Sequence, residues 1–177
     1  MNAPAAAAPP DAAGSNARLF LALWPDPATV EAILAWRSQW LWPPGCAAVD
    51  PGRLHLTLHF IGSVPAARVA EVAQGLAAPC PRFEIEFGSA QVWPRGIALL
   101  SPLAVPAELD ALHTALGHRL AALGLALEDR PYRPHVTLAR KAAAARPPAA
   151  DAALGWAVRG YSLVRSAGGY TRIADYG

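Results

Sequence analysis

The chain of 177 residues has only two cysteines and no uninterrupted apolar run of membrane-spanning length. Its two cysteines, Cys46 and Cys80, lack the CxxC spacing of structural zinc sites and dithiol redox centres. We therefore expect both to be ordinary reduced thiols, and we expect the protein to use no metal and no cofactor. Prolines and charges interrupt every apolar stretch before it reaches a membrane span of roughly 18 to 20 residues, so no membrane partner is expected.

Lys and Arg are absent before Arg18, and prolines at positions 4, 9 and 10 interrupt the alanine-rich start of the chain. A secretory signal peptide needs a basic segment followed by an unbroken apolar one, so this composition argues against it. Residues 1–17 offer no periodic apolar pattern to bury, and we expect a disordered Ala/Pro-rich extension there. Residues 18–177 are expected to form a single domain of a cytoplasmic protein.

Charged residues make up only 16% of the chain, with a net charge of +2 and a pI near 8.8. This balance suits a protein that meets an anion, but it lacks the dense basic patch of proteins that bind nucleic-acid duplexes without sequence preference. A small phosphate-bearing end is therefore a better match than a long polyanion. No coiled-coil heptads occur, so a monomer is expected.

Hydrophobic periodicity predicts strands that alternate with helices and hairpins. Short or alternating apolar runs predict strands near residues 18–24, 53–61, 83–92, 97–100, 135–140, 157–165 and 170–174. Helical spacing and capping residues predict one helix between Asp26 and Pro43, one that starts at Pro65, and one that starts at Pro106 and ends at Gly124. The expected apolar stripe of the first helix includes Leu41, and that of the last is Leu109, Leu112, Leu116, Leu120 and Leu123. This mixed order is typical of an α+β fold rather than of a doubly wound parallel sheet.

The most informative feature is a near-repeat of the pattern His-apolar-Thr-Leu. It occurs at residues 55–58 and again at residues 135–138, 80 positions later, and each copy lies in a predicted strand. Side chains alternate along a strand, so His55 and Thr57 project from one face, and His135 and Thr137 repeat the arrangement. Each strand therefore presents an imidazole beside a hydroxyl.

Two such strands facing one cleft bring together the groups that displacement at phosphorus requires without a metal. One neutral histidine deprotonates the attacking water, while the other, protonated, donates to the leaving sugar oxygen. Both forms coexist near neutral pH because the unperturbed pKa of histidine is about 6.5. We therefore predict His55 and His135 as the catalytic acid-base pair, with the Thr57 and Thr137 hydroxyls binding the non-bridging phosphate oxygens.

A single His-x-Thr in a strand is more often ordinary packing than a catalytic motif. Here two copies with the same neighbours lie in the two halves of the folded region, which favours the functional interpretation over coincidence. The copies are too similar to distinguish the base from the acid. His113 and His118 lie on a predicted helix, where solvated or partly packed histidines are common, and no role is assigned to them.

These segments resemble the LigT-like RNA 2′,3′-cyclic phosphodiesterases, also called bacterial 2′-5′ RNA ligases, of the two-histidine (2H) phosphoesterase superfamily. The resemblance runs from Arg18 to about Tyr176. The segments that carry it are Arg18-Leu-Phe-Leu-Ala-Leu23, Leu54-His-Leu-Thr-Leu-His-Phe-Ile-Gly62, Arg130-Pro-Tyr-Arg-Pro-His-Val-Thr-Leu-Ala-Arg140 and Tyr161-Ser-Leu-Val-Arg-Ser166.

The resemblance implies an α+β, bilobal fold. Two pseudo-symmetric lobes of antiparallel or mixed sheet, with outer helices, surround a central cleft, and each lobe supplies one His-x-Thr strand. The implied activity is metal-independent hydrolysis of RNA 2′,3′-cyclic phosphate termini to 2′-phosphomonoesters, with RNA 3′ ends or nucleotides bearing that group as partners. Phe20 and Arg140 map onto family positions that line the site. In an ideal strand Arg140 points away from His135, so a bend or its long side chain would be needed.

Further candidates surround the two motifs. His59 is expected to share the strand face of His55 and Thr57 and to line the cleft, and its spacing from His55 suits a zinc site only on a helix. Arg130 is expected to bind an RNA phosphate, because guanidinium groups match phosphate geometry, whereas Arg133 is expected to be a solvated charge. Nucleobase stacking is open among Trp24, Trp42, Trp93 and Tyr132.

Other functions are also open from the sequence. The same histidine pair suits another cyclic phosphodiester and, by microscopic reversibility, 2′-5′ RNA ligation. A non-catalytic RNA-end or nucleotide-binding protein of this fold is a third possibility, although binding alone needs no paired acid and base.

Overall fold

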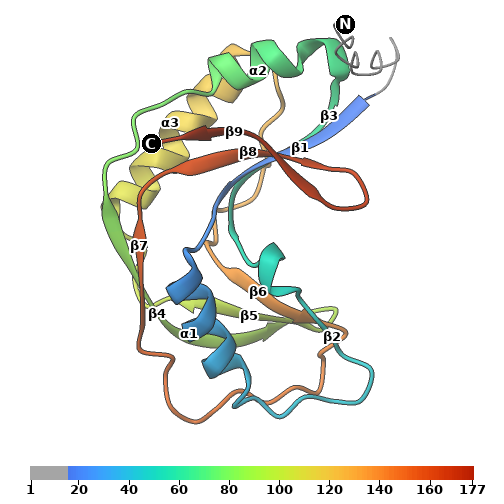
Figure 1. Cartoon of the computed structure of the whole chain (residues 1–177), viewed down its shortest axis with the longest axis vertical. Coiled ribbons are helices and arrows are strands. Elements are labelled where there is room, and N and C mark those ends of the chain that lie inside the picture. Colours follow the sequence, from blue (N-terminus) through green and yellow to red (C-terminus); the bar gives the residue numbers. More distant parts are fainter. Residues whose placement is uncertain (1–15) are drawn as a thin grey trace, which may run out of the picture.

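The computed structural model describes residues 16–177, which form one antiparallel sheet of nine strands together with three α-helices (Figure 1). The strands are β1 (Asn16–Leu23), β2 (Ala47–Ala48), β3 (Leu56–Pro65), β4 (Phe83–Trp93), β5 (Ile97–Pro102), β6 (Val136–Arg140), β7 (Leu154–Val158), β8 (Tyr161–Ser166) and β9 (Tyr170–Tyr176). The helices are α1 (Pro27–Arg37), α2 (Val69–Gly75) and α3 (Ala107–Ala122), and the 3₁₀ turns are η1 (Pro51–Arg53) and η2 (Ala66–Arg68).

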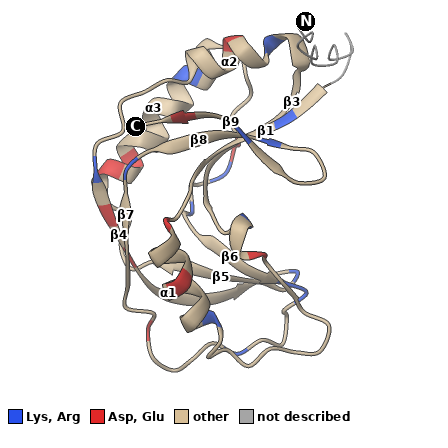
Figure 2. Cartoon of the chain, viewed as in Figure 1, with Lys and Arg blue, Asp and Glu red and all other residues tan. Residues whose placement is uncertain are grey.

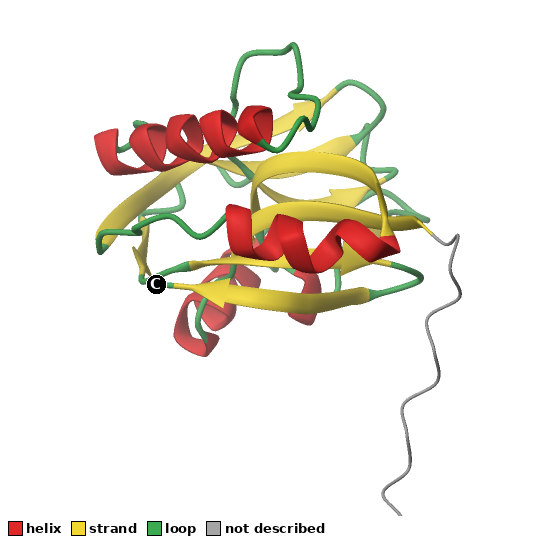
Figure 3. Ribbon diagram, turned by 90° about the horizontal axis from the view of Figure 1, so that it is seen from above, coloured by secondary structure: helices red, strands yellow, loops and turns green. Residues whose placement is uncertain are grey.

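The order of the strands divides the sheet into two lobes. It runs β7-β4-β5-β6-β3-β1-β8-β9, with β2 attached to β6, and the lobes meet where β6 pairs with β3. The sheet curls so that the two halves face each other (Figure 1). α3 packs on β3 and α1 on β7, and the helices lie at the periphery of the strands (Figure 3). The expected α+β, bilobal architecture is confirmed.

Strand β1 lies in the middle of its lobe and packs on both faces. Leu19, Leu21 and Leu23 belong to the main hydrophobic core. Phe20 and Ala22 point the other way and form a small separate cluster with Val164 and Trp24. A strand buried on both faces reads as a continuous apolar run, which is why this segment is so uniformly hydrophobic.

The helices α1 and α3 can be compared with the limits and the apolar stripes that the sequence predicted for them. The Asp26 carboxylate accepts a hydrogen bond from the Thr29 N–H at 2.8 Å and caps α1 as expected. However, α1 ends at Arg37, well before Pro43, and Leu41, which was expected on its apolar stripe, is 68% exposed. The α3 stripe is confirmed for Leu109, Leu112, Leu116 and Leu120, which are buried. Leu123 lies one residue beyond the helix and is half-buried.

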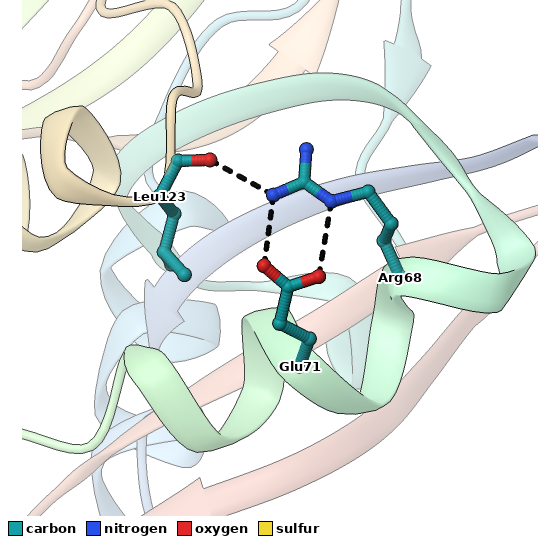
Figure 4. Close-up of polar contacts among 3 residues, drawn as sticks. All are labelled: Arg68, Glu71 and Leu123. Carbon is teal, nitrogen blue, oxygen red and sulfur yellow. Dashed lines mark hydrogen bonds and ion pairs between the residues drawn. The ribbon is translucent and has the colours of Figure 1, made fainter.

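The expectation that Pro65 starts a helix was wrong. Pro65 is the last residue of β3, and η2 separates it from α2. At the end of that turn, the Arg68 guanidinium donates to both carboxylate oxygens of Glu71 at 3.0 and 3.1 Å, and to the Leu123 carbonyl at 2.9 Å (Figure 4). The exposed ion pair adds little stability, but the third bond satisfies a carbonyl at the end of α3 and ties α2 to it.

The strand expected over residues 157–165 is in fact two strands. β7 pairs with β4 in one lobe, and β8 pairs with β1 in the other. The chain passes between the lobes at Gly160, where a Cβ would collide with the Tyr176 carbonyl oxygen. Periodicity alone could not reveal this break, because both strands are apolar and only two residues separate them.

The folded region also starts earlier than expected. β1 begins at Asn16, two residues before Arg18, and Ala17 is buried. The rest of the expected extension lies outside the described residues. Within residues 16–177, no helix has the length and apolar character to cross a bilayer.

The Tyr161 hydroxyl provides a test of the packing. It accepts a hydrogen bond from the Ala78 N–H and donates one to the Leu76 carbonyl, both at 2.7 Å. Tyr161→Phe leaves these backbone groups unpaired, so we expect urea unfolding to show a loss of about 1–3 kcal/mol. The control is Tyr176→Phe, which removes one bond, to the Ala73 carbonyl at 2.7 Å, and should cost less. An equal or smaller loss for Tyr161→Phe would contradict this account.

Candidate active site

The two His-x-Thr segments meet at the junction of the lobes. Leu56 and Val136, both fully buried, form the pair that joins β3 to β6 in antiparallel orientation. Each is the first residue of its strand, and His55 and His135 come directly before them. The expected bounds of the two strands were therefore one residue or more too early. The two motifs lie on adjacent, paired strands, a neighbourhood that the sequence did not predict.

The register of this pair brings the four polar side chains together. Continuing it by one residue in each direction places His55 opposite Thr137, and Thr57 opposite His135. Because side chains alternate, all four lie on the face opposite to the buried Leu56. All four are half-buried. Each histidine thus lies across from the threonine of the other motif.

Both histidines are held by the same backbone hydrogen bond. His55 Nδ1 lies 2.6 Å from the Arg53 carbonyl oxygen, and His135 Nδ1 lies 2.7 Å from the Arg133 carbonyl oxygen. A carbonyl only accepts, so each ring carries a hydrogen on Nδ1 and donates it. Nε2 of each ring is therefore the atom available to take or give a proton. The sequence repeat extends to the hydrogen bonding.

The environment lowers the pKa of both histidines below the ordinary 6.5. Burial is the main cause in each case, and the hydrogen bond to the backbone carbonyl offsets part of it. The positive charges of His135 and Arg140 lower the pKa of His55 further, and those of Arg130 and Arg140 lower that of His135. Arg140 therefore acts on both rings, which places its charge at the junction.

Aromatic rings surround His55. Trp24 stacks on it at 5.2 Å between centroids, Phe20 lies at 5.2 Å, and Tyr170 lies edge-on at 5.4 Å. His135 has one such neighbour, Trp93, at 4.7 Å. The expected position of Phe20 beside the motif holds in this arrangement.

Of the aromatic residues left open from the sequence, Trp24 and Trp93 lie against the histidines, whereas Trp42 stacks on Trp40 at 4.9 Å. Sequence reasoning missed Tyr170, because it belongs to no motif and only the β8–β9 hairpin brings it to His55.

A β-bulge explains how Arg140 reaches the histidines. Relative to β5, strand β6 has an extra residue, Leu138, between Thr137 and Ala139. A bulge reverses the alternation of the residues that follow it. Leu138 and Ala139 are accordingly both buried, and Arg140 emerges on the face of His135. The bend that an ideal strand would have required is present.

Strand β3 carries a bulge at the same place, and it changes the face expected for His59, although His59 still lines the pocket beside the junction. Relative to β1, Leu58 is an extra residue between Thr57 and His59. His59 therefore turns away from the face of His55 and is buried, with 7% of its surface exposed. The next residue, Phe60, turns toward that face and is 45% exposed. Aligning the two motifs matches Phe60 to Arg140, and this comparison could have identified Phe60 from the sequence.

His59 is part of a stack of three rings behind β3. Its ring lies 4.0 Å from that of His113 on α3, which lies 3.8 Å from that of Tyr132. His59 Nε2 is 2.8 Å from the His113 carbonyl oxygen, and the Tyr132 hydroxyl donates to the Thr57 carbonyl at 3.5 Å. Burial lowers the pKa of His59 and, with the adjacent His59, that of His113 to about 4. The stack is neutral at pH 7 and ties α3 to both motifs.

A pocket of about 530 Å³ adjoins the junction on the side of His135 and Thr57. Its wall includes Phe60, and Arg130 lies 6.0 Å above the Phe60 ring. The Arg130 guanidinium also pairs with Glu128 at 3.0 Å. Other lining residues are His59, Trp93, His113, Thr114, His118, Leu127, Pro131, Tyr132 and Arg133.

Comparisons with known proteins agree with this geometry. Residues 24–169 match the 2′-5′ RNA ligase superfamily. The chain belongs to this superfamily. The RNA 2′,3′-cyclic phosphodiesterase of Escherichia coli (strain K12) is 33% identical over 132 residues, which cover 72% of this chain and 74% of that protein. The protein of the same name from Thermus thermophilus is 33% identical over 168 residues, which cover 84% and 81%.

Solved structures of superfamily members show the same fold. The crystal structure of E. coli LigT complexed with 3′-AMP has a TM-score of 0.77 and 28% identity, covering 91% of this chain and 97% of that one. A crystal structure of a Thermus thermophilus protein has a TM-score of 0.73 and 27% identity, covering 89% and 96%. Within residues 16–177 of this superfamily member, no group of three or more His, Cys, Asp or Glu side chains is arranged to hold a metal ion.

The shared effect of Arg140 can be tested by titrating the histidines. Arg140→Gln removes a positive charge that acts on both rings, so the pKa values of His55 and His135 should both rise. Arg130→Gln should raise only that of His135. NMR titration of the imidazole resonances measures both effects, with the exposed Arg82→Gln as control. A rise confined to one ring in Arg140→Gln would contradict the geometry.

The ring stack predicts a loss of stability in acid. The pKa of His113 falls from 6.5 to about 4 on folding, so below pH 6.5 the unfolded chain takes up the proton first. The contribution of His113 to the free energy of unfolding is fully present above pH 6.5 and is lost as the pH falls toward 4. Because solvent partly reaches the ring, we expect this loss to be about 1–2 kcal/mol. The His113→Phe variant keeps a ring in the stack but has no group that titrates. Urea unfolding should therefore show that its free energy of unfolding, relative to that of the wild type, rises by this amount when the pH is lowered from 7.5 to 4.5. A constant difference between the two proteins would argue against it.

Proposed function

We propose that this protein is a metal-independent phosphodiesterase that opens 2′,3′-cyclic phosphates at RNA ends to 2′-phosphomonoesters, with His55 and His135 as its acid and base. The observation that carries the proposal is the matched pair of histidines on adjacent strands, each oriented by a carbonyl so that Nε2 is available. A binding protein needs neither two proton-transfer groups nor their identical orientation.

The reaction needs one proton removed and one supplied. A neutral histidine accepts a proton from water through Nε2 as the water oxygen attacks phosphorus. The bond from phosphorus to the 3′ oxygen breaks, and the protonated histidine donates to that oxygen. Low pKa values keep one ring neutral, and the negative phosphate favours the protonated form of the other.

The groups around the histidines suit a bound phosphate. The Thr57 and Thr137 hydroxyls lie on the same sheet face, and Arg140 adds a positive charge that reaches both rings. Hydroxyl and guanidinium donors stabilise the charge that develops on the non-bridging oxygens. The phosphate therefore lies between the two motifs, with Arg140 at one side.

The adjoining pocket suits the base of the terminal nucleotide. Phe60 is exposed on its wall, and the Arg130 side chain, paired with Glu128, is 62% exposed. Layers in contact are about 3.5 Å apart, so a base between ring and guanidinium needs about 7 Å, slightly more than the present 6.0 Å. A small shift of Arg130 provides that space. Its role is thus stacking, with its N–H groups directed at a neighbouring phosphate.

The names of the relatives support the same chemistry. Two proteins at 33% identity are RNA 2′,3′-cyclic phosphodiesterases, and LigT of E. coli has been crystallised with a nucleotide. Ligation to a 2′-5′ bond follows the same steps, with a ribose hydroxyl in place of water as the group that attacks phosphorus, and uses the same two histidines.

The test is hydrolysis of a nucleoside 2′,3′-cyclic phosphate in excess EDTA. We expect the wild type to form the 2′-phosphate, identified by ³¹P NMR, despite the chelator. His55→Ala and His135→Ala should each lose about 10²-fold or more in kcat, the usual effect of losing a general acid or base. Glu31→Ala, at an exposed position on α1, is the control. Activity that survives both histidine substitutions, or that EDTA abolishes, would refute the proposal.

A further inference from the structure

A row of aromatic rings lines the concave wall of the lobe that contains β1, β3, β8 and β9. The Phe20 ring is in the middle, with centroids 6.3 Å from Phe60 on one side and 5.1 Å from Tyr170 on the other. The two outer rings are the accessible ones, with 45% of Phe60 and 39% of Tyr170 exposed. Exposed rings at such a site are stacking platforms for the bases of single-stranded nucleic acid.

Arginines accompany these rings. Arg53 lies 5.2 Å above the Tyr170 ring, and Arg172 lies 5.3 Å above the Trp24 ring. A guanidinium that stacks on a ring still has N–H groups at its edge for phosphate oxygens. Figure 2 shows Lys and Arg positions on both halves of the sheet, at the end of β6 and along β1 and β8. Alternating rings and guanidinium groups are typical of surfaces that follow a single strand.

This second platform is attached directly to the reacting histidine. Arg53 donates to the Gly168 carbonyl at 3.2 Å and so connects η1 to the β8–β9 hairpin. The carbonyl of the same Arg53 accepts the hydrogen bond from His55 Nδ1. Tyr170 itself lies 5.4 Å from the His55 ring. A group bound on Tyr170 would therefore be adjacent to the phosphate but on the opposite side from Phe60.

The proposed acid-base chemistry leaves this platform without a role. Tyr170 and Arg172 belong to neither His-x-Thr segment, and they lie just beyond residues 24–169, which match the superfamily. Arg172 has one acidic neighbour, Asp175, at 3.8 Å, and that carboxylate also accepts a hydrogen bond from Ser162. Its charge is thus only weakly compensated.

We propose that Tyr170, Arg53 and Arg172 form a subsite for a second nucleotide of the same RNA strand, with its base on Tyr170 and its phosphodiester on the two arginines. This inference rests on the proposed function, in which the terminal base occupies the Phe60 pocket. The continuous wall through Phe20 favours one strand that spans both platforms. The substrate class that follows is a single-stranded oligonucleotide end rather than a free cyclic mononucleotide.

The test compares a cyclic mononucleotide with a trinucleotide that carries the same 2′,3′-cyclic phosphate end. For the wild type we expect kcat/KM to be at least about tenfold higher for the trinucleotide, as one stacked base and its phosphate contact provide. Tyr170→Ala and the double variant Arg53→Gln, Arg172→Gln should each bring this ratio close to one, whereas Tyr170→Trp should preserve it. Because both substrates react at the same histidines, the ratio of the two kcat/KM values is unaffected by any general effect of a substitution on His55. Arg82→Gln, an exposed arginine, is the matched control.

The outcomes separate this inference from the function on which it rests. If the wild type hydrolyses both substrates with equal kcat/KM, or if Tyr170→Ala keeps the ratio, the subsite is refuted while the phosphodiesterase stands. If neither substrate is hydrolysed, the proposed function fails, and the subsite is judged by fluorescence titration with the 2′-phosphate products. In that titration, the subsite is supported if the wild type binds the trinucleotide product more tightly than the mononucleotide product and Tyr170→Ala abolishes the difference. Equal binding of the two products by the wild type refutes it.

A further arm distinguishes one strand from two. A free dinucleotide with a 5′ hydroxyl is added to the mononucleotide assay. We expect weak inhibition at most, because the subsite takes the residue linked to the terminal nucleotide. Strong inhibition that Tyr170→Ala removes, without a preference for the trinucleotide, would overturn the assignment to the same strand.

Discussion

The pairing of β3 with β6 is the contact on which the rest of the structure depends. The two lobes of the sheet join at Leu56 and Val136, and the histidines stand directly before these residues. One hydrophobic pair thus sets both the closure of the sheet and the placement of the two histidines. The ring stack of His59, His113 and Tyr132 lies behind the same junction and holds α3 against it. Substitutions there are expected to disturb fold and activity together.

A second constraint is that the site must hold neutral rings among positive charges. Burial and nearby arginines lower the pKa of both His55 and His135, the charge of His135 lowers that of His55 further, and one backbone carbonyl for each ring opposes these effects. The free site is therefore poised to receive an anion, because a phosphate offsets the same charges that depress the pKa values. In the proposed mechanism, substrate binding and protonation of the general acid are thus coupled through electrostatics.

The two lobes are related in backbone and different in chemistry. Bulges at Leu58 and Leu138 turn equivalent positions into the site, but one position is Phe60 and the other is Arg140. The Phe60 ring suits a nucleobase, and the Arg140 guanidinium suits a phosphate. A duplicated strand pattern can in this way suit an asymmetric substrate, and the aromatic wall with Tyr170 is where we propose that a second nucleotide binds.

The sequence by itself was enough to determine the α+β class, the long stripe of α3, and the four motif residues His55, Thr57, His135 and Thr137. These follow from local periodicity and from a repeat of unusual residue types, which need no knowledge of distant contacts. Only the tertiary structure decided the sides on which His59 and Arg140 lie, the division of residues 157–165 into two strands, and the position of Tyr170 beside His55. The physical reason is that a bulge or a change of lobe depends on the partner strand, and a side chain's face reverses with a shift of one residue.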